Sequence, residues 1–103
     1  MKMMAYTDSE IQDRLKELPG WKAEDKALVR MQTFPEYLDA LEFVNRVGKN
    51  AEEQNHHPDM FMNYKRVTVR YWTHKANGIT ELDFKLAHMV EKILQEVYKP
   101  RAS

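Results

Sequence analysis

Hydrophobic and polar residues along this chain repeat with a period that switches between that of a helix and that of a strand. Three stretches, which begin after Thr7, Pro35 and Thr80, repeat apolar residues at three- and four-residue spacing, as amphipathic helices do. Four shorter runs show the two-residue alternation of β-strands and come in two pairs. The pattern predicts the order helix, two strands, helix, two strands, helix.

The first helix is predicted to begin at a capping box, Thr7-Asp8-Ser9-Glu10, in which residues 7 and 10 satisfy each other's backbone amides. Its inward stripe is Ile11, Leu15 and Leu18, and Pro19-Gly20 ends it. Two strands at 21–24 and 27–34 then surround a tight turn at Asp25-Lys26. In the second strand one face carries Ala27, Val29, Met31 and Thr33, and the other carries Leu28, Arg30 and Gln32.

The second helix is predicted from Pro35, since proline favours the first helical turn. Its apolar residues are Phe34, Leu38, Leu41, Val44, Val47, Gly48 and Ala51. Helical character should fade by Asn55, because Pro58 disfavours helical geometry at His57.

A second strand pair is predicted at 59–63 and 67–74 around a turn at 64–66, and Val67, Val69, Tyr71 and Thr73 share one face. After a loop at 75–78, a second capping box at 80–83 opens the last helix, which Pro100 ends. The inward residues of that helix are predicted to be Leu82, Leu86, Met89, Val90, Ile93 and Val97.

Hairpin pairing of the strands predicts an α+β fold, a four-stranded antiparallel sheet with three helices packed on one face. The other face, carrying Arg30, Gln32, Thr68 and Arg70, should be wet or meet another subunit. The chain has 103 residues, which predicts a single domain over residues 1–103.

Composition narrows the classes of function. Lys+Arg and Asp+Glu number 16 each, so no global charge favours nucleic acid or an anionic membrane. Cysteine is absent, which excludes thiol nucleophiles, disulfides and thiolate metal sites. A cysteine-free chain without a signal peptide suits the cytoplasm, where we expect this protein. No apolar run approaches the roughly 18 residues needed to span a bilayer.

The candidate chemistry centres on His56-His57-Pro58 and His74. Imidazole titrates near neutral pH, so several histidines can supply acid and base roles without metal or cofactor. If the last two strands pair around 64–66, their far ends meet and bring these three histidines to one rim of the sheet. Glu52, in the last turn of the second helix, would lie at the same rim and could orient an imidazole.

Plainer interpretations stand beside each of these residues. His56 and His57 could belong to a polar loop, and as neighbours in extended chain they point apart, which suits one metal ion poorly. His74 could be a surface residue before a loop, and Glu52 part of a solvated helix face. Asp83 has a structural role in a capping box, as the third residue of the helix after Thr80.

The spacing of Glu52, His56-His57-Pro58, Tyr64, His74 and Asp83 resembles the signature of the pterin-4a-carbinolamine dehydratases. The likeness covers about residues 7–98. It includes Pro19-Gly20-Trp21, the helix from Pro35, and Thr73-His74 followed by Gly78-Ile79-Thr80-Glu81. One position departs from the family, where tryptophan often lies two residues after His-His-Pro: here it is Met60, which could alter the wall of the pocket.

The resemblance implies dehydration of 4a-hydroxytetrahydropterin to quinonoid dihydropterin, in tetrahydrobiopterin recycling for aromatic amino acid hydroxylases. It implies His56, His74 and Glu52 as catalytic residues and His57, Pro58, Thr73 and Asp83 as substrate-binding residues. Pterin is then the substrate, with no cofactor and no metal, and the chain should form a homodimer or homotetramer. Which histidine is acid and which is base stays open.

Two other functions remain compatible with the sequence. The family includes a mammalian dimerisation cofactor of a homeodomain transcription factor, so a non-enzymatic interaction module is one alternative. A dehydratase-like enzyme acting on a molybdopterin-type compound is another. The intact histidines favour catalysis, because an adaptor has no need of them.

Overall fold

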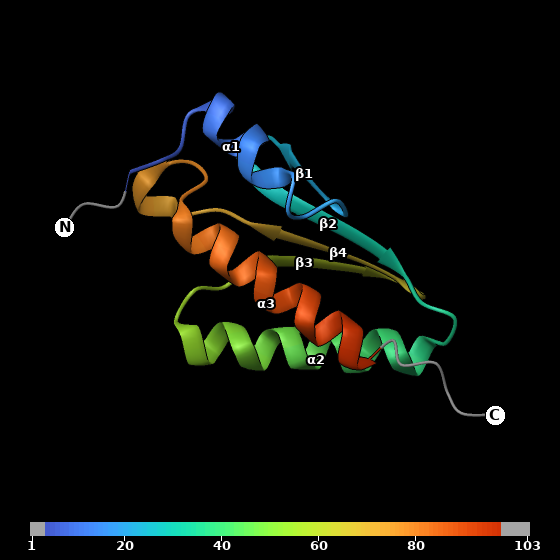
Figure 1. Cartoon of the computed structure of the whole chain (residues 1–103). Helices are drawn as coiled ribbons and strands as arrows, with labels where there is room; N and C mark the ends of the chain where they lie inside the picture. Colours follow the sequence, from blue (N-terminus) through green and yellow to red (C-terminus); the bar gives the residue numbers. More distant parts are fainter. Residues whose placement is uncertain (1–3, 98–103) are drawn as a thin grey trace.

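The computed structural model of the chain describes residues 4–97 (Figure 1). Its elements are α1 (Asp8–Leu15), β1 (Trp21–Glu24), β2 (Ala27–Thr33), α2 (Tyr37–Gln54), β3 (Asp59–Asn63), β4 (Arg66–Tyr71), a short 3₁₀ turn η1 (His74–Ala76) and α3 (Glu81–Val97). The four strands form one antiparallel sheet in the order β1-β2-β4-β3. The predicted fold class is confirmed. The predicted end of the last helix at Pro100 lies outside the described residues.

Both hairpins turn tightly where the sequence placed their turns. Asp25 and Lys26 have φ values of 49° and 64°, so both adopt the left-handed conformation that a two-residue hairpin turn with matching twist requires. At the second hairpin Tyr64 has φ 55°, and Asn63 pairs with Arg66. Because the turns fix the register, the far ends of β3 and β4 also meet, with Asp59 opposite Arg70.

The first helix begins as predicted and ends earlier. The Thr7 amide donates to the Glu10 carboxylate at 2.8 Å, and the Glu10 amide donates to the Thr7 hydroxyl at 3.2 Å. Hydrogen bonding to the carboxylate by the Thr7 backbone amide, with a smaller contribution from the Thr7 side chain, holds the pKa of Glu10 below its ordinary value. The helix ends at Leu15, before the predicted Pro19, because the amides of residues 16–18 bond three residues back and tighten the last turn.

The long helices bury somewhat different stripes from those predicted. In α2 the buried residues are Ala40, Phe43, Val47 and Ala51, while Leu38 is 72% exposed. In α3 they are Asp83, Phe84, Leu86, Ala87, Val90 and Leu94. Both helices carry more apolar positions than one stripe can hold, and only contact with the sheet selects which are buried. Leu82, Met89, Ile93 and Val97 are partly buried at the margin of the core.

The prediction that Arg30 and Gln32 face away from the helices is wrong. Arg30 pairs with Val69 and Gln32 with Val67, and both valines are buried beneath the helices. Arg30 can lie on this side because its Nε donates to Glu91 Oε2 of α3 at 2.9 Å. The predicted positions of Thr68 and Arg70 on the opposite face agree with the alternation of β4.

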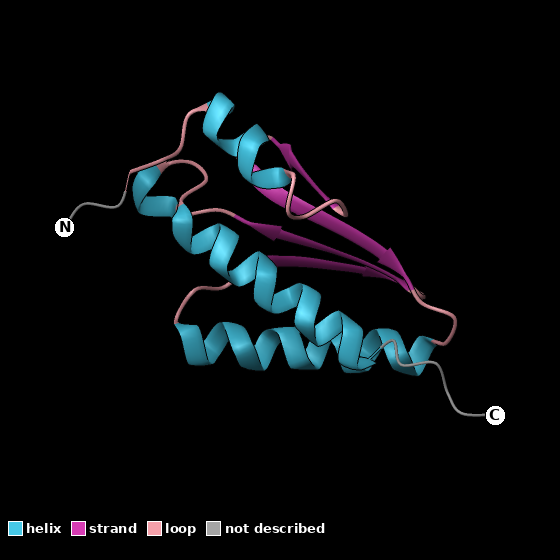
Figure 2. Cartoon of the chain, viewed as in Figure 1, coloured by secondary structure: helices cyan, strands magenta, loops and turns pink. Residues whose placement is uncertain are grey.

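The helices lie together on one side of the sheet, as Figure 2 shows, and α2 packs against α3. The core between helices and sheet includes the Phe34 and Phe43 rings, whose centroids are 5.2 Å apart. No helix within residues 4–97 is long and apolar enough to cross a membrane.

Candidate active site

The predicted site residues come from segments that meet at one end of the sheet. The C-terminal end of α2, the start of β3, the end of β4 and the start of α3 lie at the same end of the molecule (Figure 1). The pairing of Asp59 with Arg70 brings the residues just before β3 beside those just after β4. Residues about 30 positions apart in sequence can therefore bond directly here.

The chain leaves α2 in a way that turns His56 inward. Asn55 ends the helix in the left-handed conformation, with φ 53°, and the His56 amide donates to the Ala51 carbonyl at 3.1 Å. The His56 ring then stacks on Tyr71, the last residue of β4, with centroids 5.4 Å apart and planes at 22°. Only 11% of the His56 side chain is exposed.

His56 is paired with a fully buried carboxylate. Its Nε2 lies 2.6 Å from Oδ1 of Asp83, in the first turn of α3, and the Asp83 side chain is 0% exposed. The other oxygen, Oδ2, accepts from the Thr73 hydroxyl and from the Thr80 amide, each at 2.8 Å. The bond from the Thr80 amide confirms the capping role expected of Asp83, and the same side chain also holds His56.

His57 forms a second imidazole–carboxylate pair in a different setting. Its Nε2 lies 2.8 Å from Oε1 of Glu52, but 56% of the His57 side chain and 81% of the Glu52 side chain are exposed. The predicted contact between Glu52 and a histidine is therefore present, and its partner is His57. Water screens such an exposed pair, so it adds little to stability. Pro58, half-buried, follows directly and leads into β3.

His74 lies in a compact loop beyond the end of its strand. The prediction that this strand reaches His74 is wrong: β4 ends at Tyr71, because the Thr73 amide bonds the Gly78 carbonyl at 2.9 Å and closes the loop on itself. The His74 ring stacks on Trp72 with centroids 3.8 Å apart. Its ring nitrogens form no hydrogen bond to another residue between 4 and 97. His74 directly follows Thr73, which binds Asp83.

Two residues that the sequence did not single out for the site take part in it. Tyr71 packs against His56, and its buried hydroxyl has no hydrogen-bond partner among the described residues. Burial, with a further contribution from the charge of Asp83, raises the pKa of Tyr71 above its ordinary value. Thr80 is 0% exposed and its hydroxyl lies 2.8 Å from that of Thr73. A capping box signals such a threonine, but the sequence gives no sign of its cross-loop partner.

Within residues 4–97, no group of three or more His, Cys, Asp or Glu side chains could hold a metal ion. Met60, where the family often has tryptophan, packs against the core. A tryptophan here would have to share the space beside Gly48, since the Met60 methyl lies 3.9 Å from where a Cβ on that glycine would be.

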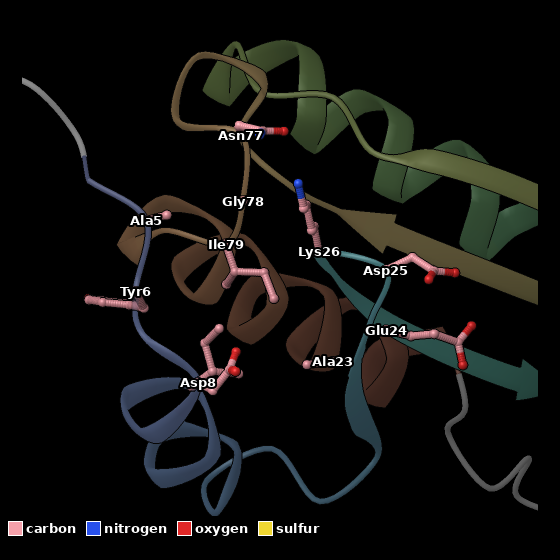
Figure 3. A pocket seen from close by; sticks show the side chains of 11 residues that line it. Ala5, Tyr6, Asp8, Ala23, Glu24, Asp25, Lys26, Asn77, Gly78 and Ile79 are labelled. Atoms are coloured by element: carbon pink, nitrogen blue, oxygen red, sulfur yellow. The ribbon is translucent and has the colours of Figure 1, made fainter.

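A hollow of about 300 Å³ lies beside the end of the loop that carries His74, and no histidine is among the residues that line it (Figure 3). The N-terminal segment, α1, the Asp25-Lys26 turn and residues 77–79 line it. In the close-up Ile79 points into the hollow, while Tyr6, Glu24 and Asp25 point away from it. Its polar groups do not converge, so the imidazole–carboxylate pairs remain the candidate site.

Fold and site together define a class: small α+β proteins with paired imidazoles and carboxylates at one end of an antiparallel sheet. Residues 4–93 match the family model for pterin 4 alpha carbinolamine dehydratase. The chain belongs to this family.

Relatives support the same assignment over almost the whole chain. A protein of Thermomicrobium roseum is 43% identical over 88% of this chain and 98% of its own length. One of Nostoc punctiforme is 39% identical over 84% of this chain and 94% of its own. Both carry the provisional name pterin-4-alpha-carbinolamine dehydratase.

Two solved structures share the fold. A transcriptional coactivator/pterin dehydratase from Brucella melitensis superposes with a TM-score of 0.82 at 37% identity, covering 86% of this chain and 97% of that one. A pterin dehydratase-like protein identified as a RuBisCO assembly factor of the alpha-carboxysome gives 0.58 at 18% identity, covering 71% and 84%. At that identity the second likeness concerns the fold alone.

Proposed function

We propose that this protein dehydrates 4a-hydroxytetrahydropterin to quinonoid dihydropterin by histidine acid/base catalysis. The observation that carries the proposal is the pair formed by His56 and the buried Asp83, 2.6 Å apart. A buried carboxylate that orients an imidazole is a recurrent arrangement for proton transfer. Family membership supplies the substrate class.

The reaction needs one proton donor and one proton acceptor. The lone pair of N5 forms the C4a=N5 double bond as the C4a–O bond breaks, and the departing hydroxyl takes a proton to leave as water. A base then removes the N5 proton. Each well-placed acid or base contributes about 10²–10⁴-fold, and orientation of the substrate adds to this.

The histidines suit different parts of this chemistry. Nε2 of His56 is committed to Asp83, which leaves Nδ1 to exchange a proton with substrate. His74 has both ring nitrogens available and its ring held against Trp72, so it is the second acid/base group. His57, exposed and paired with Glu52, is suited to hydrogen bonding the polar edge of the pterin. Pro58 would shape the same edge.

The wider setting is also part of the proposal. The pterin is the substrate and no cofactor or metal takes part. The protein works in the cytoplasm as a homodimer or homotetramer and recycles tetrahydrobiopterin for an aromatic amino acid hydroxylase. These points rest on the family resemblance.

A stopped-flow assay of 4a-hydroxytetrahydropterin decay tests the proposal. We expect wild-type protein to accelerate the decay, and His56→Ala and His74→Ala each to lose about 10²–10⁴-fold of that acceleration. His88→Ala is the matched control, because His88 is exposed on α3 beside Arg14 and Lys85 and should leave the rate unchanged. Decay at the spontaneous rate with wild-type protein would reject the activity.

A non-enzymatic interaction module is the main alternative, since the Brucella protein is described as a transcriptional coactivator as well as a pterin dehydratase. An adaptor would tolerate loss of either histidine without change in partner binding. A dehydratase acting on another reduced pterin would instead leave 4a-hydroxytetrahydropterin untouched and act on that compound.

A further inference from the structure

We propose that Thr73 and Thr80 are positioning residues, whose hydroxyls form a one-directional hydrogen-bond chain that holds Asp83 and fixes the tautomer of His56. The inference deepens the proposed dehydratase, since it specifies which His56 nitrogen meets the substrate. It concerns a threonine, Thr80, that the spacing of the site motif does not include.

The chain of contacts is short and closed to water. The Thr80 hydroxyl lies 2.8 Å from the Thr73 hydroxyl, which lies 2.8 Å from Oδ2 of Asp83. Thr73 is 8% exposed, and Thr80 and Asp83 are 0% exposed. Buried polar groups without water must satisfy one another, so each hydrogen in this chain has a required direction.

The direction follows from counting protons. An ionised Asp83 only accepts, so the single hydroxyl proton of Thr73 is donated to Oδ2. The Thr73 oxygen then accepts the Thr80 proton at 2.8 Å, since the other acceptor within reach of that hydroxyl, Oδ2 of Asp83, is already held by Thr73 and lies 3.5 Å away. The Thr80 oxygen in turn accepts from the Leu82 amide at 3.2 Å. Every donor is used once, and the sequence of bonds runs from the helix amide to the carboxylate.

This order leaves one place for the His56 proton. With Oδ2 occupied by Thr73 and the Thr80 amide, Oδ1 accepts from Nε2 of His56. The neutral imidazole therefore carries its hydrogen on Nε2 and presents Nδ1 as a proton acceptor. The Tyr71 ring, stacked on the imidazole, opposes a ring flip that would carry Nε2 away from Asp83.

The hydrogen-bond chain would let Thr73 and Asp83 act on the reaction through His56, without contact to the substrate. Both are buried behind His56, and Asp83 has protein partners on both oxygens. Removing the Thr73 hydroxyl leaves Oδ2 short of a donor and loosens the carboxylate. His56 would then sample both tautomers. A binding residue would raise KM, whereas a positioning residue lowers kcat.

The first test reads the tautomer directly and needs no activity. We expect imidazole ¹⁵N spectra of ligand-free wild-type protein to show the hydrogen of neutral His56 on Nε2. Thr73→Val should give a mixture of tautomers, and Thr73→Ser should restore the wild-type spectrum. A wild-type hydrogen on Nδ1, or an unchanged spectrum in Thr73→Val, would overturn the inference even if the protein proves to be a dehydratase.

The second test uses kinetics. Thr73→Val should lower kcat about 10–100-fold with KM little changed, as loss of a residue that orients an active group does. Thr80→Val should lower kcat about tenfold or less, because the Thr80 amide still reaches Asp83. The serine variants should recover both losses. A raised KM at wild-type kcat would overturn the positioning role.

A matched control separates positioning from helix capping. Thr80 precedes α3 as Thr7 precedes α1, and each hydroxyl accepts from a backbone amide of its own helix. Thr7→Val therefore removes a comparable cap far from His56, and it should lower stability without changing kcat or the His56 spectrum. If Thr73→Val fails to fold, the spectrum of Thr73→Ala, which also removes the hydroxyl, decides: an undisturbed His56 tautomer there would overturn the chain.

Discussion

At the scale of single residues, two adjacent histidines occupy opposite environments. His56 is buried against Tyr71 and paired with Asp83, whereas His57 is exposed and paired with Glu52. The sequence indicates that neighbours in extended chain point apart, but not which of them faces inward. That choice is made by the left-handed Asn55 at the end of α2.

The two carboxylates should therefore differ in importance. We expect Asp83→Asn to lower the dehydration rate about 100-fold, because an amide in place of the carboxylate disturbs the hydrogen bond that orients His56. Glu52→Gln should change it by about threefold or less, since solvent already screens its contact with His57. Both substitutions preserve shape. Stopped-flow rates of the two variants, measured side by side, check the difference, and equal losses would contradict it.

Tyr71 gives a prediction about alkaline stability. Its pKa is raised from 10.0 in the folded protein, so above about pH 10 the unfolded chain releases a proton that the folded protein keeps. Stability is therefore lost as pH rises through that range, by up to about 1.4 kcal/mol per pH unit from this residue. Tyr71→Phe should show a shallower loss in urea unfolding between pH 9 and about pH 11.

The same variant tests the unpartnered hydroxyl. Because the buried Tyr71 hydroxyl lacks a hydrogen-bond partner among the described residues, its removal should raise the free energy of unfolding by about 1 kcal/mol at pH 7. Tyr64→Phe, at the exposed β3–β4 turn, is the control and should keep the wild-type slope with pH. A Tyr71→Phe protein less stable than wild type would contradict this expectation, because it would show that the hydroxyl stabilises the folded state.

At the scale of elements, local sequence signals predicted which helices, strands and turns are present, whereas long-range contacts determine where some of them end. The capping box at Thr7 and the turn at Asp25-Lys26 are local chemistry, and both are present. At Thr80 the carboxylate half of the predicted box is present, while the Thr80 hydroxyl accepts from the Leu82 amide instead of the Asp83 amide. The end of β4 is not local, because the bridge between Thr73 and Gly78 turns the chain before His74. No pattern within the strand itself indicates that bridge.

Arg30 is a second case in which a long-range contact overrides the local sequence pattern, here in the side of the sheet on which a residue lies. A charged residue amid alternating apolar ones is expected to face solvent, yet Arg30 lies beneath α3 because Glu91, 61 residues away, accepts from its Nε. Glu91 also accepts from the Trp21 indole at 2.9 Å. The pair therefore joins β1, β2 and α3, and the sequence offers no sign that these three residues meet.

Neutralising Glu91 should weaken this junction. Glu91→Gln keeps the shape but leaves a half-buried guanidinium without its counter-charge, and we expect a loss of about 1–2 kcal/mol in unfolding free energy. Glu42→Gln, which breaks the exposed pair with Arg46, is the control and should cost about 0.5 kcal/mol or less. Urea denaturation at neutral pH measures both, and similar losses would show that Arg30 finds other partners.

At the scale of the whole molecule, the site exists only when distant segments are assembled. His56 leaves α2, Asp83 begins α3, and Thr73 follows β4, so the contacts of Asp83 span three elements. The motif spacing and the hairpin geometry placed the histidines at one end of the sheet. Motif spacing and hairpin geometry could not predict that the carboxylate partner of His56 is Asp83 and not Glu52. That pairing depends on how α3 lies across the sheet.

Two tryptophans allow the cooperativity of this assembly to be measured. Trp21 is bonded to Glu91 at the junction of β1 and α3, and Trp72 stacks on His74 beside the site. Since one core connects both regions, site and junction should unfold together. Fluorescence of Trp21→Phe and Trp72→Phe variants, each reporting the remaining tryptophan, should then give the same urea m-value, and each midpoint should match that variant's far-UV circular dichroism.

The outcome distinguishes two kinds of site. If the Trp72 signal changes at lower urea than the circular dichroism of the same variant, the loop that carries His74 opens independently, and its closure on Thr73 and Gly78 is a local equilibrium. In that case catalysis by His74 would fail before the fold does. We expect the fluorescence and circular dichroism transitions to coincide instead. The Thr73 hydroxyl is hydrogen-bonded to Asp83 and Thr80 in a buried position, so opening the loop would break these bonds and form no new contact that compensates for them.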